Sequence, residues 1–443
     1  MSFKNINKLN VLRTLTTGEQ VEVGVLAQNL QGVFFQYHKE YIDKFGNLSP
    51  FNLDKNVQLQ QAPRHPHGNI HGAFSDSLPD GWGLLLQDLV FRQEGMYPTQ
   101  ITAMDRLAFV GSHGLGGLSF TPVSDFSPKQ HHEANLETLG LEAQALFDKP
   151  ISEEIEGHTQ QVLAALVAVG NSGGARPKAQ VYMQTGDSKN CRTYAQAGDE
   201  AWIVKFTSKN LALGHEEGLC EAVYLQMAEL AGCHPPSWQL IEAPKSSGAK
   251  AWLAVKRFDY LPAQVVQGKE TQRAGRLHMQ SACGLLDADY RSPSLDYDVL
   301  IRASRQLCKS TAAGQLVFRR AIFNLFASNQ DDHSKNWGFL QDDDGSWNPA
   351  PFYDVTFSPN PFNGHVTSYG GHGNTPPLET IQQLAVRAGF ASWKEARILI
   401  QEVVGAIDQF ANLAGKQTIS LRTVREIEKT LALRKKENAE LLV

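Results

Sequence analysis

The sequence predicts an α+β fold of two lobes, preceded by an N-terminal α+β subdomain and ending in a mainly helical C-terminal lobe. A chain of 443 residues is too long for one small core. Short β-branched and aromatic segments bounded by glycine recur before residue 260, whereas apolar residues at helical spacing recur after it. We therefore expect a subdomain at 1–125, a first lobe at 126–260 and a helical lobe at 261–443.

The composition argues against several classes of protein. A net charge of −5 gives no basic field for nucleic-acid binding by this chain alone. The five cysteines are scattered and form no Cys-x-x-Cys pair, which favours reduced thiols over disulfides or a zinc site. The first 14 residues mix Lys, Asn and Arg with single apolar residues, and the apolar runs are too short to cross a membrane. We expect a cytoplasmic protein with no membrane partner.

The N-terminal subdomain begins with two strands. Residues 21–25 and 32–37 are rich in β-branched and aromatic side chains, and a helix is expected at 84–92. The glycine-rich segment 111–117 precedes an expected strand at 118–120. It lacks the strand-then-helix context of a phosphate loop, so we interpret it as a tight turn.

The first lobe contains an ordered series of elements. They are a helix, a glycine-rich loop, two strands, a second helix and a third strand, at 152–169, 170–178, 179–183, 201–206, 219–230 and 251–255. Lys205 lies near the end of the second strand, and Glu221 lies in the first turn of the second helix. This is the order of a kinase N-lobe, where a loop covers the phosphates, a lysine contacts them and a glutamate orients the lysine. We expect Arg257 and Asp259 to pair in the connector between the lobes.

A polar cluster at 329–336, Asn-Gln-Asp-Asp-His-Ser-Lys-Asn, lies between two apolar runs. Such a cluster is costly to bury unless its groups are paired or bind a ligand. Asp331 and Asn336 have the Asp-x-x-x-x-Asn spacing of kinase catalytic loops, in which the Asp orients the attacking hydroxyl and the Asn holds magnesium. Asp354 follows a short apolar segment and supplies a second carboxylate for a metal ion.

Five segments together point to one protein family. They read Asp-Ser-Leu-Pro-Asp-Gly-Trp-Gly, Arg-Leu-Ala-Phe-Val-Gly, Gly-Gly-Ala-Arg-Pro-Lys, Asn-x-Asp-Asp-His-x-Lys-Asn and Tyr-Asp, at 76–83, 106–111, 173–178, 329–336 and 353–354. With them the chain resembles the HipA family of serine/threonine kinases, the toxin halves of bacterial toxin–antitoxin pairs. The resemblance implies a two-lobed protein-kinase-like (HipA-like) fold.

The resemblance also implies a role for each matching residue. Asp331 would be the catalytic base, with His333 and Lys335 serving the same loop. Asn336 and Asp354 would hold Mg²⁺, and ATP would be the phosphate donor. The nucleotide-binding residues would be Gly173, Gly174, Ala175, Lys178, Lys205 and Glu221.

One position departs from the family pattern. Family members can autophosphorylate a serine in the glycine loop, which expels the loop and disables ATP binding. Counting back from Lys178, that serine position falls on Asn171, and Ser172 is its neighbour. Self-inactivation is therefore either absent here or moved to Ser172.

Each candidate residue also has a purely structural interpretation. Lys205 is alternatively a strand-end lysine that reaches water. Glu221 is explained equally well as a carboxylate that stabilises a helix N-terminus. Asp331 is explained as part of a polar turn. His365 and His372 flank a glycine-rich segment and form either a loop or a metal site.

Three functions follow from these alternatives. The first is a toxin kinase whose substrate, by resemblance, is a translation component such as an aminoacyl-tRNA synthetase. A HipB-like helix-turn-helix antitoxin would restrain it, and operator DNA would be reached only through that partner. The second is a catalytically weak co-repressor subunit. The third is a metal-dependent phosphohydrolase, which would leave the glycine loop without a role; it would use Asp331, Asp332, His333 and Asp354.

Overall fold

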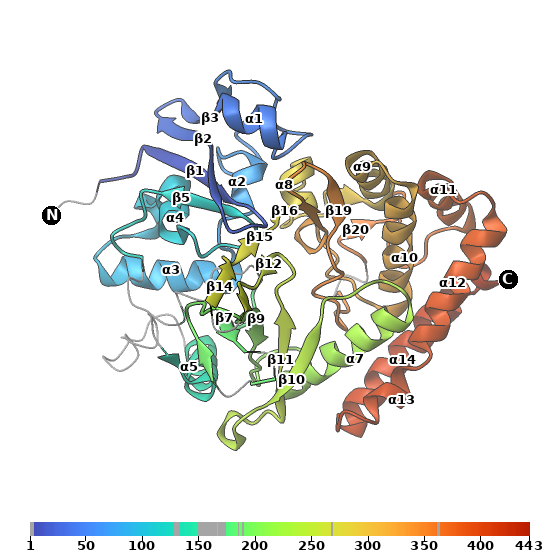
Figure 1. Ribbon diagram of the computed structural model, residues 1–443. Coiled ribbons are helices and arrows are strands. Elements are labelled where there is room, and N and C mark those ends of the chain that lie inside the picture. Colours follow the sequence, from blue (N-terminus) through green and yellow to red (C-terminus); the bar gives the residue numbers. More distant parts are fainter. Residues whose placement is uncertain are drawn as a thin grey trace.

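The computed structural model describes residues 4–127, 133–148, 166, 174–184, 186–187, 190–266, 269–360 and 364–443. Figure 1 shows an N-terminal sheet with its helices, a second sheet beside it, and a helical region that ends at the C-terminus. Among the described residues, no helix is both long enough and apolar enough to span a membrane. The helix expected at 152–169 falls outside these ranges except for Leu166.

The N-terminal sheet has five antiparallel strands in the order β4-β3-β2-β1-β5. The strands are β1 (Lys8–Thr14), β2 (Gln20–Asn29), β3 (Gly32–Tyr37), β4 (Gln60–Gln61) and β5 (Leu118–Thr121). The strands expected at 21–25, 32–37 and 118–120 are confirmed. Strand β1 was not expected, because one of its inward positions is Arg13, which is fully buried and donates to the Tyr41 hydroxyl at 3.0 Å.

Four helices accompany this sheet. They are α1 (Lys39–Phe45), α2 (Gly72–Ser75), α3 (Gly81–Gln93) and α4 (Ala103–Val110). Helix α3 contains the expected helix 84–92 and begins three residues earlier. Its Trp82, Leu86 and Phe91 are buried in the apolar cluster of the next sheet rather than in that of its own. The N-terminal region is therefore packed directly against the first lobe.

The second sheet has six antiparallel strands in the order β10-β11-β9-β7-β8-β6. They are β6 (Glu133–Ala134), β7 (Lys178–Met183), β8 (Cys191–Arg192), β9 (Glu200–Lys205), β10 (Trp238–Glu242) and β11 (Ala251–Lys256). Two helices, α5 (Leu136–Asp148) and α7 (Glu217–Leu230), pack against it. The register of β7 with β9 pairs Lys178 with Lys205, so both lysines lie at one end of the sheet.

The connector after β11 joins the two lobes and contacts the glycine-rich segment 111–117. Arg257 pairs with Asp259 as expected, and both are buried. The Gly116 amide donates to Asp259 at 2.6 Å, and the Gly114 carbonyl accepts from Arg257 at 3.2 Å. Segment 111–117 therefore braces the connector from the N-terminal side.

The C-terminal region begins with strands before it becomes helical. Short strand pairs come first: β12 (Tyr260–Leu261) with β15 (Gly275–Arg276), and β13 (Gln264–Val266) with β14 (Lys269–Gln272). A three-stranded sheet and a parallel pair follow: β16 (His278–Ser281), β18 (Gly338–Gln341) and β19 (Trp347–Pro349), then β17 (Leu295–Asp296) with β20 (Thr367–Ser368). Strands of two to four residues leave no alternation to detect, so the expectation of a mainly helical region omitted them.

The helices of this region enclose the largest apolar cluster. They are α8 (Ala282–Leu286), α9 (Tyr297–Cys308), α10 (Thr311–Ala327), α11 (Leu378–Ala388), α12 (Trp393–Ile407), α13 (Phe410–Ala414) and α14 (Leu421–Glu437). Helix α7 of the first lobe is buried in the same cluster through Cys220, Val223 and Met227. Because α7 contacts both the second sheet and helices α12 and α13, it fixes one lobe against the other.

Candidate active site

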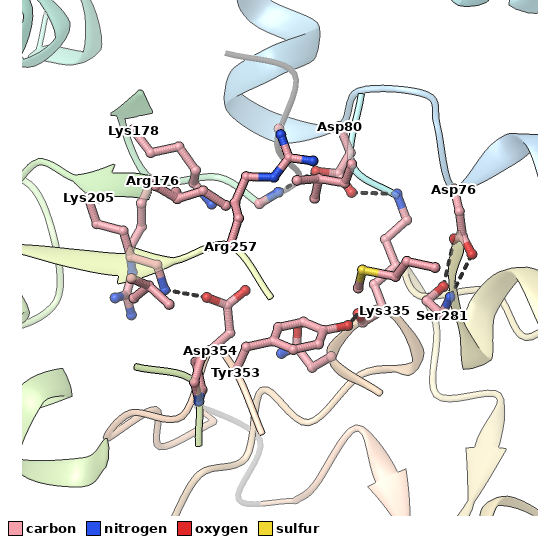
Figure 2. Close-up of a pocket in the computed structure, with 18 of the residues that line it drawn as sticks. Asp76, Asp80, Arg176, Lys178, Lys205, Arg257, Ser281, Lys335, Tyr353 and Asp354 are labelled. Atoms are coloured by element: carbon pink, nitrogen blue, oxygen red, sulfur yellow. Dashed lines mark hydrogen bonds and ion pairs between the residues drawn. The ribbon is translucent and has the colours of Figure 1, made fainter. Parts of the chain in front are cut away.

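A cavity of about 470 Å³ lies where the three parts of the molecule meet. Figure 2 shows Lys178 and Lys205 of the second sheet on the left, with Asp354 of the C-terminal lobe beside Lys205. Asp80 of the N-terminal region and Lys335 of the C-terminal lobe lie opposite. The sequence-predicted residues that line it are Gly174, Ala175, Lys178, Lys205, Glu221, Asp331, His333, Lys335, Asn336 and Asp354. Gly173 and Ser172, with Asn171, lie outside the described residues.

Lys205 is the centre of the charge network in this cavity. It stands at the end of β9 and is 7 % exposed. Its Nζ donates to Glu221 Oε1 at 2.5 Å and also to Asp354 Oδ1 (Figure 2). Glu221 is buried and stands fifth in α7, beyond the first turn, so the helix-terminus interpretation of this residue was wrong. The expected lysine–glutamate pair is present, and Asp354 completes it.

Arg176 extends the same network from the glycine loop. Its guanidinium contacts Glu221 Oε2 at 3.0 Å and Glu217 Oε1 at 2.5 Å. One carboxylate of α7 therefore holds both the strand lysine and the loop arginine. Nothing local in the sequence indicated these contacts, because the partners of Arg176 lie more than 40 residues away.

Asp354 is held in its charged form by three cations. Burial alone raises the pKa of a carboxyl group, but Lys205, Lys178 and Arg176 outweigh burial and hold the pKa of Asp354 well below its usual range. Its backbone is left-handed, with φ of 53°, which is uncommon for a residue other than glycine. Backbone strain of this kind is concentrated at functional sites.

The loop at 329–336 carries Asp331, which lines the cavity. The Asp331 side chain is 67 % exposed, and the Asp331 carbonyl accepts from Asn336 Nδ2 at 2.7 Å. His333 lies near it, with Nε2 3.9 Å from Asp331 Oδ1. The loop therefore presents one accessible carboxylate, and Asn336 fixes the backbone that carries it.

Lys335 points across the cavity to a residue that sequence reasoning missed. Its Nζ donates to Asp80 Oδ2 at 2.5 Å and lies 4.4 Å from the centre of the Tyr290 ring. Asp80 Oδ1 accepts from the Gly174 amide of the glycine loop (Figure 2). The sequence placed Asp80 in the family segment 76–83 without a role, because nothing local connects it to loops 94 and 255 residues away.

Asp332 and His365 support the structure of the loop instead. Asp332 is buried and accepts from the Tyr297 hydroxyl at 2.5 Å, from the Thr367 amide at 3.0 Å and from His365 Nδ1 at 2.8 Å. His365 is thus a partner of Asp332, whereas His372 is exposed. No metal-binding group of three His, Cys, Asp or Glu side chains occurs among the described residues. Asp332, which a phosphohydrolase would need as a metal ligand, is therefore occupied by structural hydrogen bonds.

The donor atoms suit a magnesium ion. Asp354 Oδ1 accepts a hydrogen bond from Lys205, whereas Asp354 Oδ2 accepts none from the described residues. The Asn336 amide donates through Nδ2 and its Oδ1 accepts nothing from the described part of the chain. One carboxylate and one amide oxygen are hard ligands of the kind that Mg²⁺ takes, with water filling its other positions.

Comparisons with known proteins identify the family of this chain. The model of the HipA N-terminal domain matches residues 17–121, and that of the HipA-like C-terminal domain matches residues 170–411. A solved structure of HipA from Shewanella oneidensis MR-1, in a complex with HipB and its operator DNA, superposes with a TM-score of 0.67 at 17% identity. The match covers 97% of this chain and 98% of that one. A comparison with curated protein sequences found no match. Since the family models together span most of the sequence, the chain belongs to the HipA family.

Proposed function

We propose that the protein is an ATP- and Mg²⁺-dependent serine/threonine protein kinase. The observation that carries this proposal is the position of Lys205, which binds Glu221 and Asp354 in the cavity that Asp331 and Asn336 also line. A strand lysine oriented by a helix glutamate, opposite a base and two oxygen ligands, is the arrangement that phosphoryl transfer requires. A phosphohydrolase would need neither Lys205 nor the glycine loop.

Each residue would contribute position or charge. The exposed Asp331 would orient a serine or threonine hydroxyl and take its proton as the oxygen attacks the γ-phosphorus. The bond between the γ-phosphorus and the β–γ bridging oxygen then breaks, and ADP leaves. Lys205 would bind the phosphates, and Asn336 Oδ1 and Asp354 would hold Mg²⁺. When bound, Mg²⁺ neutralises charge on the phosphate oxygens.

We also propose a toxin role in a pair with a HipB-like helix-turn-helix antitoxin. The structural neighbour was solved with HipB and operator DNA, which supports a similar partner here. The net charge of −5 supports DNA contact through that partner only. The protein substrate would be a translation component such as an aminoacyl-tRNA synthetase, and its phosphorylation would arrest growth.

The test is transfer of labelled γ-phosphate from Mg-ATP to proteins of a host lysate. Asp331→Ala should abolish the label, because the hydroxyl loses its orienting carboxylate, while exposed Asp43→Ala far from the cavity should retain it. Mass spectrometry of the labelled protein would identify the substrate, and label on Ser172 would establish autophosphorylation. If Mg-ATP binds but neither protein gives a label, the co-repressor function replaces the kinase.

A further inference from the structure

We propose that Asp80 of the N-terminal subdomain is a positioning residue, which ties the glycine loop to Lys335 of the catalytic loop and so sets the phosphate end of the cavity. The inference rests on the proposed kinase activity. It starts from a carboxylate that joins two loops of two different lobes, although it belongs to neither lobe.

Asp80 gives up a favourable local contact to do this. It is the N-cap residue of α3, where aspartate ordinarily accepts a hydrogen bond from an amide of the first turn. Within the described chain its side chain makes no such bond. Both oxygens instead leave the helix, Oδ1 toward the Gly174 amide and Oδ2 toward Lys335 Nζ at 2.5 Å. The orientation of the Asp80 carboxylate is therefore set by Gly174 and Lys335 and not by its own helix.

The electrostatics of the pair favour the charged form of both groups. Burial raises the pKa of Asp80, but Lys335 and the Gly174 amide outweigh it and lower that pKa below its usual value. Burial lowers the pKa of Lys335, and Asp80 more than restores it, so that pKa lies above its usual value. Asp80 is only 5 % exposed, so removing either partner leaves the other charge poorly compensated.

The backbone around Asp80 is built for close approach to the glycine loop. Gly81 has φ of 43°, and a Cβ on it would lie 2.5 Å from the Gly174 carbonyl oxygen. The Trp82 amide donates to that same oxygen at 2.9 Å, and its indole donates to the Lys178 carbonyl at 2.9 Å. Three consecutive residues thus hold the main chain of the loop at 174 and 178.

These contacts assign the N-terminal subdomain a direct part in nucleotide binding. The glycine loop is attached to the first lobe and Lys335 to the second, and Asp80 fixes the separation of the two. Because transfer depends on placing the phosphates within about an ångström, a residue that fixes this separation controls both affinity and rate.

The experiment is a double-mutant cycle of Asp80→Asn and Lys335→Met. Each variant is measured for its Kd for Mg-ATP by calorimetry, its kcat for phosphate transfer and its thermal midpoint. Asn keeps the shape of Asp80 and an acceptor for Gly174, but loses the charge that holds Lys335. The matched control is Asp88→Asn, which removes a carboxylate paired with Arg106 inside the same subdomain, at 2.6 Å.

We expect each single variant to raise the Kd and lower kcat by about tenfold, the order of one charged hydrogen bond. The Kd and kcat of the double variant should lie within about twofold of those of the more impaired single variant. Both substitutions break the same link, so their effects should not add. Asp88→Asn should leave Kd and kcat unchanged. Equal Kd and kcat in Asp80→Asn and the unmodified protein, additive losses, or faster transfer in Asp80→Asn would each overturn the proposal.

Measuring Mg-ATP binding and phosphate transfer separately allows the role of Asp80 and the kinase activity to be tested apart. If the unmodified protein binds Mg-ATP but transfers no phosphate, the kinase proposal fails, and the cycle in Kd still decides the role of Asp80. If it does not bind Mg-ATP at all, both proposals fail.

Discussion

Two adjacent carboxylates show how position rather than residue type assigns a role. Asp331 lines the cavity and is largely exposed, so its carboxylate is accessible from the cavity. Asp332 points the other way and is saturated by a tyrosine, a histidine and a backbone amide. A buried carboxylate with three donors stabilises the loop, since each donor offsets its desolvation. The loop thus places a structural carboxylate directly beside an accessible one.

Glu221→Gln tests the pair at the centre of the cavity. Gln keeps the shape of the side chain but leaves Lys205 and Arg176 without the charge that now holds them at 2.5 and 3.0 Å. We expect kcat/KM for ATP to fall by about ten- to a hundredfold, the worth of one or two charged hydrogen bonds. Steady-state transfer assays measure this. Glu229→Gln, an exposed carboxylate of the same helix, is the control, and a fully active Glu221→Gln would remove Glu221 from the site.

At the scale of elements, local patterns determined what the sequence could predict. Strands such as β7 and β9 and the helix α7 carry their alternation or their apolar run within one segment, and their expected bounds agree with the structure within two residues. Helix α12 shows its start through Ser392, which accepts from the Glu395 amide at 3.3 Å.

Contacts between distant segments were beyond sequence reasoning. Strand β1 was missed because Arg13, a charged residue at an inward position, breaks the apolar alternation. The role of Asp80 depends on two loops brought together only by folding. Motif spacing singled out Asp331 and Asn336 because one loop holds both, and both line the cavity. It could not identify a partner on another element.

Gly81→Ala tests the close approach of α3 to the glycine loop. An Ala here meets both a left-handed backbone and the Gly174 carbonyl oxygen at 2.5 Å, so the loop must move. We expect the Kd for Mg-ATP to rise at least tenfold, with a loss of stability of about 1–2 kcal/mol from the backbone alone. Calorimetric titration and thermal unfolding measure the two effects.

Gly95→Ala is the matched control for this change. Gly95 follows the same helix and has φ of 76°, but a Cβ there would meet open space. It should therefore share the loss of stability and leave nucleotide binding unchanged. Similar binding by the two alanine variants would show that the contact with Gly174 is unimportant.

At the scale of the whole molecule, the N-terminal subdomain is fixed to the C-terminal lobe by buried polar contacts. Arg13 donates to Gln341 at 3.1 Å, and the Ser281 hydroxyl donates to Asp76 at 2.6 Å. His278 of β16 lies in the same interface, with Nε2 3.2 Å from the Leu48 carbonyl. Because His278 is fully buried, protonating it would place a charge in this interface away from water.

Acid should therefore loosen the molecule at this interface. Burial, and then Arg13, lower the pKa of His278 to about 3, so the folded protein keeps it neutral, whereas the unfolded chain takes up a proton below about pH 6.5. The unfolded state binds more protons between these values, so the free energy of unfolding should fall as pH falls through this window. The slope for one such histidine is about 1.4 kcal/mol per pH unit. Denaturant unfolding at pH 7, 6 and 5 measures this slope. The His278→Gln variant, which keeps a donor for the Leu48 carbonyl, should reduce the slope by about one proton. The control His372→Gln, at an exposed position, should leave the slope unchanged. An unchanged slope in His278→Gln would mean that other groups cause the loss in acid, and that this interface is not the part of the fold that acid opens.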